Sequence, residues 1–252
     1  MKYPILAIET TGQFASVALK DTKGFIHSEG LTEKLNHLKG LLPITEKLLD
    51  DAGLDIRDIK TFAVSEGPGS FTGIRIGIST VRALAQITGA QVIGVPTLEA
   101  FVFNVPNYKG IVCPVFDARM SQLYGGAFTL EGNKINSLIK TGAYSVKDYC
   151  GLLTDIVEEN RVTKDFPFEY RFFGDGIDVF RDYLSEWGES LRISDTDILY
   201  GYEQRNRMQI AASVLKWAED YGEEKDYSML LPVYVRKAEA QRRLDEKKDH
   251  EK

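Results

Sequence analysis

Residues 67–77 read GPGSFTGIRIG, a loop punctuated by glycines that leads from the strand-like segment 61–65 into a long apolar helical pattern. Its glycines allow a sharp turn or a close approach of another backbone, its proline fixes one φ angle, and its serine or threonine can cap the helix. The loop therefore predicts a tight connection from a strand to a helix. The positions concerned are Gly67, Gly69, Ser70, Thr72 and Gly73.

A second interpretation of this loop is an anion site, because the first N–H groups of a helix attract negative charge. The spacing departs from two familiar phosphate loops. The lysine followed by serine or threonine of a P-loop is missing, and the third glycine falls one residue late for the dinucleotide fingerprint. A nucleotide site here would be of another kind, and both interpretations stay open.

Composition excludes several function classes. The chain has 252 residues, 43% of them hydrophobic, with a formal net charge of -6 and a pI near 5.3. Such a chain can build a sizeable core but lacks the excess of lysine and arginine needed to grip a nucleic-acid backbone by itself. RNA could still be the substrate of a larger assembly. No signal-peptide pattern or membrane-length apolar run is visible, so the cytoplasm is the expected location, without membrane association.

The cysteines and histidines do not have metal-site spacing. Cys113 and Cys150 are far apart in the sequence and are predicted to be two buried thiols. The histidines, His27, His37 and His250, form no His-x-x-x-His pair. We therefore expect no metal site and no cofactor.

The order of elements predicts a duplicated domain. The apolar segment 3–8 ends in Glu9 and is followed by a turn and a second strand. The apolar segment 111–116 ends in Asp117 and is followed by a turn and another strand at 123–128, which repeats that order. Helical patterns follow the strands, and we expect these helices to flank a mixed sheet. The predicted divisions are residues 1–105, residues 106–235 and a charged tail, residues 236–252, expected to be a solvated helix or disordered.

The helical pattern from Ile74 to Ala90 is apolar around its whole circumference, with Arg75 and Arg82 as its only charges. A helix of this kind is either sunk in a large core or held between its own domain and another chain. The helical pattern at 34–52 also carries more apolar residues than one narrow stripe needs. The two helices could jointly present an apolar surface.

Two carboxylates stand where ligand clefts of α/β sheets open. Glu9 and Asp117 each end an apolar strand, so they could bind a metal or serve as acid and base. The alternative is that each carboxylate accepts hydrogen bonds from the adjoining turn. No Gly-x-Ser-x-Gly motif supports a serine hydrolase.

Taken together, five segments resemble the TsaB (YeaZ) family. They are residues 5–11 (ILAIETT), 67–77, 94–98 (GVPTL), 117–120 (DARM) and 232–236 (PVYVR). The resemblance covers most of residues 3–236 and implies two tandem RNase H-like domains of the actin-like ATPase and sugar kinase class (ASKHA), with mixed sheets flanked by helices. It also implies a function as the non-catalytic subunit of the bacterial machinery that places threonylcarbamoyl on N6 of adenosine 37 in tRNAs reading ANN codons.

The resemblance further implies the partners. A catalytic relative, TsaD, performs the transfer from threonylcarbamoyl-AMP, an ATPase, TsaE, joins the complex, and tRNA is met only through the complex. Alone, family members pair with themselves. The catalytic relative holds a metal with paired histidines in its first helix, whereas this chain has His37 alone, and it has Glu9 where Asp is commoner.

Family members pair through the first two helices of the N-terminal domain, and no catalytic residue is implied. The contact residues expected here are Leu38, Leu41, Leu42, Thr45, Leu49, Ile74, Ile78, Val81, Arg82 and Ala85. The family-motif positions without an assigned role are Glu9, Gly67, Gly69, Ser70, Thr72, Gly73, Arg75, Asp117 and Arg119.

Two alternatives come from other function classes. An autonomous ATPase or sugar kinase would use Glu9, Asp117 and the glycine loop. A protease would need a nucleophile, base or metal set that the sequence does not display.

Overall fold

The computed structural model describes residues 2–31, 37–105, 107–163, 169–191, 198–200 and 208–236. Its first sheet has the strand order β3-β2-β1-β4-β5. The first three strands form an antiparallel meander, and β1, β4 and β5 run parallel to one another. The bounds are β1 (Ile5–Glu9), β2 (Ser16–Lys20), β3 (Ile26–Gly30), β4 (Thr61–Gly67) and β5 (Gln91–Pro96).

The second sheet repeats this topology with the order β10-β9-β6-β7-β8. Again three strands form an antiparallel meander, and the strands that follow lie parallel to its first member. The bounds are β6 (Ile111–Asp117), β7 (Gln122–Glu131), β8 (Lys134–Ser145), β9 (Tyr170–Phe173) and β10 (Ile198–Tyr200). The predicted fold class, two RNase H-like units with mixed sheets, is thereby confirmed.

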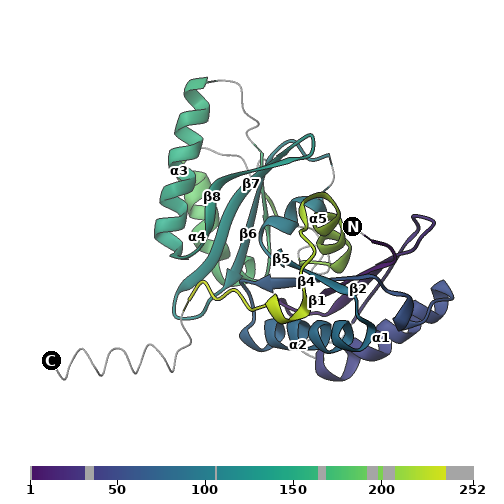
Figure 1. Cartoon of the computed structure of the whole chain (residues 1–252). Coiled ribbons are helices and arrows are strands. Elements are labelled where there is room, and N and C mark those ends of the chain that lie inside the picture. The colour runs from purple at the N-terminus through teal and green to yellow at the C-terminus, as the bar shows by residue number, and fades with distance from the viewer. Residues whose placement is uncertain are drawn as a thin grey trace, which may run out of the picture.

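Helices cover both sheets (Figure 1). The helices α1 (His37–Ala52) and α2 (Phe71–Thr88) lie side by side on one face of the first sheet, and α5 (Ala211–Tyr221) covers the other face. The helices α3 (Val146–Thr163) and α4 (Gly176–Ser190) pack against the second sheet. Three short helical turns complete the described elements: η1 (Ile56–Asp58), η2 (Glu99–Asn104) and η3 (Tyr227–Met229).

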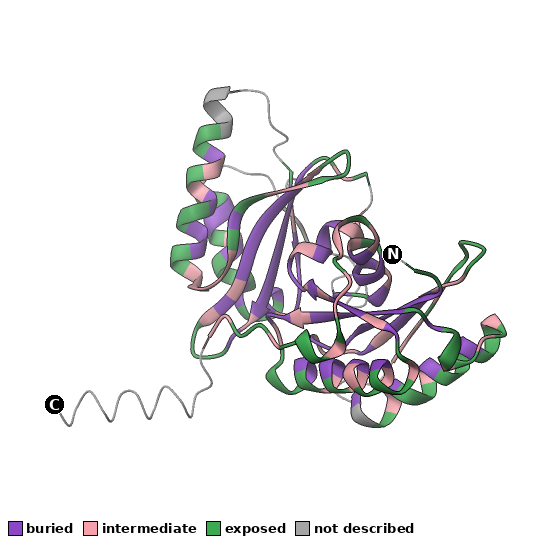
Figure 2. Cartoon of the chain, in the orientation of Figure 1, coloured by how far each residue is buried: buried purple, intermediate pink, exposed green. Residues whose placement is uncertain are grey.

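The core follows the hydrophobic pattern of the chain. Every residue of β1 is buried, as its unbroken apolar run predicted for a central strand. Figure 2 shows buried strands between helices that are exposed on their outer sides. Cys113 and Cys150 are buried free thiols, as predicted. In the part of the chain that the structure describes, no helix is both long and apolar enough to span a membrane.

The end of the described chain returns to the first sheet. The helix α5 packs on β1, β2 and β4, with Val214 and Leu215 in the same hydrophobic cluster as Ile5 and Ala7. The predicted second domain, residues 106–235, therefore contains a segment that packs on the first sheet instead of the second. The physical reason is that β1 and β4 are apolar on both faces and need a cover on each. The division near residue 105 stays a prediction, and the charged tail beyond Arg236 lies outside the described residues.

Candidate functional site

The carboxylate at the end of β1 is enclosed by its own chain. Glu9 is fully buried. Its Oε1 accepts hydrogen bonds from the backbone N–H of Thr11 and, at 2.5 Å, from the Thr11 hydroxyl, and its Oε2 accepts one from the hydroxyl of Ser65 on β4. Burial raises the pKa of the Glu9 carboxyl above its ordinary value of 4.5, and the hydrogen bonds from Ser65 and Thr11 oppose that rise. This arrangement favours the structural alternative, in which the carboxylate ties two strands and a turn together.

The raised pKa predicts a pH dependence of stability. Between pH 4.5 and the folded-state pKa of Glu9, the folded chain holds a proton that the unfolded chain has released, so the free energy of unfolding falls as pH rises through this window. Glu9→Gln mimics the protonated form and removes this titration. We expect the parent chain to lose stability relative to E9Q as pH rises above about 4.5, by up to about 1.4 kcal/mol of unfolding free energy per pH unit. Urea titrations of both proteins across pH 4–8 measure this difference in stability. Parallel pH profiles of the two proteins would contradict the prediction.

The glycine loop is packed against the turn that follows β1. A Cβ at Gly73 would lie 2.0 Å from the carbonyl oxygen of Thr10, and a Cβ at Gly77 would lie 2.4 Å from the Thr10 hydroxyl. The Thr10 hydroxyl donates to the carbonyl oxygen of Gly73 at 2.8 Å. The glycines thus serve the close approach of α2 to this turn.

Some N–H groups at the N-terminus of α2 donate hydrogen bonds to acceptors within the chain. The Ser70 hydroxyl accepts from the N–H of Gly73 at 3.2 Å, which confirms the predicted cap. The N–H of Ser70 donates to the carbonyl oxygen of Thr11 at 2.8 Å. Because these N–H groups have partners within the chain, the tight connection is favoured over the anion site.

The second strand-end carboxylate lies in a separate cluster. Asp117 accepts from the N–H of Arg119 at 2.8 Å and pairs with its guanidinium at 3.2 Å. The N–H of Asp117 donates to Asp175 at 3.1 Å, and the Gln13 amide, from the turn after β1, donates to the other oxygen of Asp175 at 3.5 Å. Burial raises the pKa of Asp175, and the Asp117 carboxylate adds to the rise. Sequence reasoning missed Gln13, because its partner Asp175 lies 162 residues away.

Two further features bear on metal or nucleotide chemistry. His37 is buried, and its Nε2–H donates to the carbonyl oxygen of Gly12 at 2.9 Å, which ties α1 to the turn after β1. Among the residues that the structure describes, no three His, Cys, Asp or Glu side chains lie together as a metal site would need. Glu9 and Asp117 each serve the turn of their own sheet. In the described part of the chain, Glu9 and Asp117 therefore act as hydrogen-bond acceptors that stabilise the fold.

The structure places the predicted contact residues of α1 and α2 at different depths in the chain. Most of them pack into this chain's own core, because positions 74, 78, 81 and 85 of α2 form a single stripe at helical spacing that faces the sheet. Seven are buried: Leu41, Thr45, Leu49, Ile74, Ile78, Val81 and Ala85. Leu42 is 55% exposed, Arg82 is half-buried, and the side chain of Leu38 lies outside the described part. Contact of these residues with a partner stays a prediction, and the buried seven serve the core of this chain.

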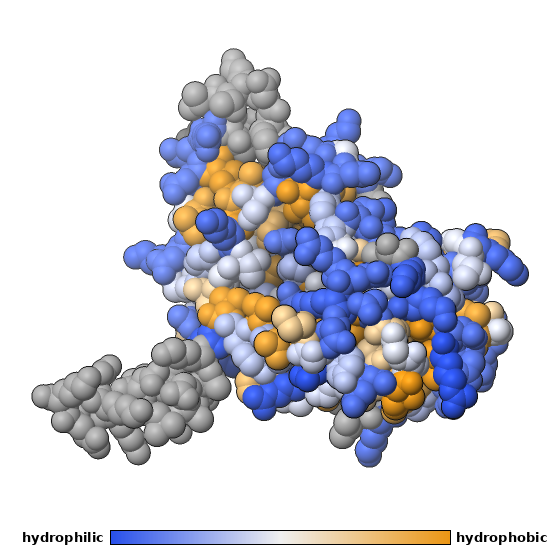
Figure 3. Space-filling view, in the orientation of Figure 1, coloured by the Kyte–Doolittle hydropathy of each residue, from blue (hydrophilic) through white to orange (hydrophobic). Residues whose placement is uncertain are grey.

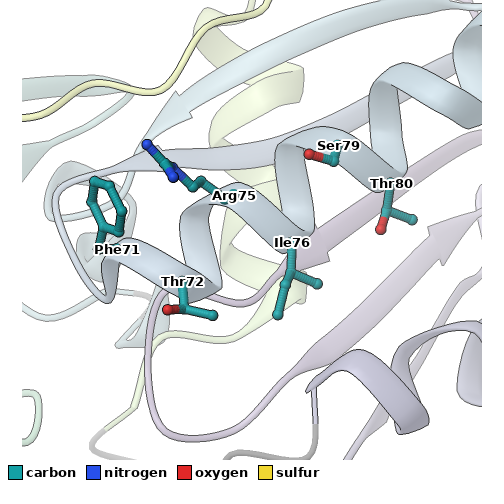
Figure 4. Close-up of a pocket in the computed structure, with 6 residues that line it drawn as sticks. All are labelled: Phe71, Thr72, Arg75, Ile76, Ser79 and Thr80. Carbon is teal, nitrogen blue, oxygen red and sulfur yellow. The ribbon is translucent and has the colours of Figure 1, made fainter.

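Another set of residues forms the solvent-facing surface of these helices, called here the outer face. Ile87 is 74% exposed, and a groove runs along α2 between residues 71 and 80. Figure 4 shows Thr72, Ile76 and Thr80 along one side of the helix and Phe71 beside Arg75 at its beginning. The outer face comprises Leu42 and Pro43 of α1 and Phe71, Thr72, Ile76, Ser79, Thr80, Ala83 and Ile87 of α2.

The two sheets define a protein with two RNase H-like units, in which α1 and α2 expose apolar side chains to solvent. A family model described as "TsaD: tRNA N6-adenosine threonylcarbamoyltransferase" matches residues 31–244. The chain is 28% identical to the tRNA threonylcarbamoyladenosine biosynthesis protein TsaB of Bacillus subtilis, over 94% of this chain and 96% of that protein. It is 34% identical to the Escherichia coli protein of that name, over 52% of this chain and 57% of that protein.

Solved structures agree on the fold. YeaZ from Pseudomonas aeruginosa superposes with a TM-score of 0.67 at 23% identity, covering 92% of this chain and 100% of that one. A second structure from this organism, described as similar to peptidase YEAZ, gives a TM-score of 0.69, also at 23% identity, over 93% of this chain and 100% of that one. The chain belongs to the TsaD family that the model describes, and within it to the TsaB (YeaZ) family. The resemblance found in the sequence is confirmed.

Proposed function

We propose that this chain is the scaffold subunit required for threonylcarbamoylation of adenosine 37 in tRNAs that read ANN codons, and that it acts by binding a TsaD-like catalytic subunit. The observation that carries the proposal is the end-to-end similarity to a TsaB named for tRNA threonylcarbamoyladenosine biosynthesis, over 94% of this chain and 96% of that protein. A TsaE-like ATPase, a homodimer of the chain alone, tRNA contact only within the complex and a cytoplasmic location are part of the same proposal.

A non-catalytic role is supported by the way the candidate groups are used. Both oxygens of Glu9 accept hydrogen bonds from Thr11 and Ser65. The glycine loop packs against Thr10, whose carbonyl oxygen occupies the space beside Gly73. His37 has its Nε2–H engaged with Gly12. A nucleotide or metal would have to displace these contacts, so the carboxylate-based ATPase is the weaker candidate.

A binding role is supported by the outer face. Leu42 and Ile87 expose large apolar surfaces, and exposed small residues such as Ser79 and Ala83 let a partner helix approach closely. A contiguous exposed apolar patch is typical of a protein interface. We propose that a TsaD-like subunit covers it.

Reconstitution tests the proposal. Purified chain, a TsaD-like subunit and a TsaE-like ATPase are incubated with tRNA, ATP and threonylcarbamoyl-AMP, and modified adenosine is measured by mass spectrometry of the digested tRNA. We expect product when all proteins are present and none when this chain is omitted or is incubated alone. Product from this chain alone would overturn the scaffold role, as would undiminished product in its absence. Hydrolysis of ATP by the isolated chain would instead favour the ATPase alternative.

A further inference from the structure

The last described segment, residues 225–236, crosses from α5 over the beginning of α2, and is called here the C-terminal strap. Figure 1 shows it as the yellow segment that runs above α2 in this view. Lys225 forms two 2.9 Å backbone hydrogen bonds with Val92 of β5, and the side chain of Leu230 is buried in the core beneath α1 and α2. The N–H of Val233 donates to the carbonyl oxygen of Glu66 at 2.8 Å. The strap is therefore anchored at several points along the first sheet.

An arginine and two rings join the strap to α2. Arg75 Nε donates to the hydroxyl of Tyr234 at 2.9 Å, and the Arg75 guanidinium lies 3.9 Å from the centre of the Phe71 ring. The rings of Phe71 and Tyr234 are 5.1 Å apart. The close fit requires glycine at position 67, where φ is +122° and a Cβ would lie 2.4 Å from the carbonyl oxygen of Val233. These contacts make the strap and the first turns of α2 one continuous surface.

The strap presents apolar side chains to solvent. Leu231 is 60% exposed, and Met229, Val233 and Tyr234 are also exposed, while Leu230 between them points into the core. Residues 229–235 read MLLPVYV and contain no charge, although the whole chain has a net charge of -6. Figure 3 shows hydrophobic residues gathered where this segment crosses the front of the molecule. A patch of this kind is typical of a protein interface.

We infer that residues 229–235 of the strap extend the outer face of α1 and α2, so that one TsaD-like subunit contacts both. This inference rests on the proposed function. The observation that selects this occupant is continuity: Phe71 and Arg75 line the groove on α2 and also hold Tyr234. A partner helix lying in the groove and reaching the beginning of α2 therefore meets the strap. Because the strap is uncharged, the matching surface of the partner is apolar.

The strap also reaches the second sheet. Arg236 donates to the carbonyl oxygen of Ala118 at 2.8 Å and lies 3.3 Å from the sulfur of Met120, in the turn between β6 and β7. A subunit bound on the strap therefore lies against a segment that is fixed to both halves of the chain.

The test is a substitution at Leu231. Leu231→Asp places a carboxylate on an exposed position, so the unfolding midpoint should stay that of the parent chain, while the Kd for the TsaD-like subunit, measured by titration calorimetry, should rise by about tenfold or more. Leu231→Met keeps the apolar surface and should leave the Kd unchanged. Val179→Asp on α4, where the parent residue is 58% exposed, is the matched control and should also bind like the parent chain.

A reference variant separates this inference from the proposed function. If Leu42→Asp on the outer face loses binding while Leu231→Asp binds like the parent chain, the inference about the strap is overturned, and the proposed docking of the partner on the outer face is supported. If both variants bind like the parent chain, the proposed docking on the outer face is overturned, and the inference about the strap is overturned with it. If Leu231→Asp alters only self-association, seen by sedimentation, the strap serves a second copy and the inference is overturned.

Discussion

Leu42→Asp is expected to weaken binding of the TsaD-like subunit by about 100-fold or more, because an unpaired charge buried at an interface costs about 3–5 kcal/mol and each 1.4 kcal/mol is tenfold in Kd. Leu42 is exposed on α1, so the substitution should leave the fold intact. Titration calorimetry gives the Kd, and circular dichroism with a thermal scan checks the fold. Loss of binding should also abolish tRNA modification in the reconstituted system.

The control for this experiment is Val179→Asp, since Val179 and Leu42 are aliphatic helix residues of nearly equal exposure, 58% and 55%. Ser79→Asp on α2 should repeat the loss, because Ser79 lines the groove on the other helix of the outer face. A carboxylate at Val81 would be uninformative, since Val81 is fully buried and its substitution would unfold the chain. Tight binding by both Leu42→Asp and Ser79→Asp would show that the partner docks elsewhere.

Local sequence signals predicted most of the fold. The unbroken apolar run before Glu9 predicted a central strand, and β1 is buried throughout. The serine or threonine of the glycine loop was predicted as a cap, and Ser70 caps α2. The repeated order of apolar strand, carboxylate, turn and strand predicted duplication, and the two sheets share one topology. Each of these signals depends on neighbours a few residues away, which is the range over which backbone geometry and periodicity act.

The candidate site was harder to predict because its contacts are distant in sequence. The helix α2 is apolar around its circumference, so periodicity alone could not say which stripe faces the sheet. The strap covers the beginning of α2 through Tyr234, which is 159 residues from Arg75. The donors that enclose Glu9 include Ser65, 56 residues away. Residue types alone do not indicate which distant residues are paired in the fold, so the burial of most predicted contact residues could not be read from the sequence.

The glycine loop illustrates how packing within a chain can account for a specific motif. Its spacing invites comparison with phosphate loops, yet its glycines lie against Thr10, Thr11 and Val233 of the same chain. Close approach of α2 to the turn after β1 brings the docking helix and the enclosed carboxylate of Glu9 into one rigid unit. The motif therefore positions α2, and with it the outer face, on the first sheet.

Gly73→Ala is accordingly expected to destabilise the chain by about 2–3 kcal/mol, the upper part of the range of about 1–3 kcal/mol typical of overpacking. The added Cβ would lie 2.0 Å from the backbone oxygen of Thr10, and a backbone atom cannot rotate away as a side chain can. The helix would have to move off the turn, breaking the 2.8 Å hydrogen bond from the Thr10 hydroxyl to the Gly73 carbonyl oxygen. Urea titration measures the loss, and the thermal midpoint should fall by roughly 4–12 °C for a chain of this size.

The matched control is Gly151→Ala in α3, where nothing lies within 4 Å of the added Cβ and the residue is exposed. There the substitution should stabilise the chain by about 0.5–1 kcal/mol, because alanine is the better helix former. The two variants make the same chemical change within helices and differ in what the new methyl group meets. Equal effects on the free energy of unfolding would contradict the close packing of α2 on the turn after β1, whereas opposite signs would show that Gly73 is required by the approach of Thr10.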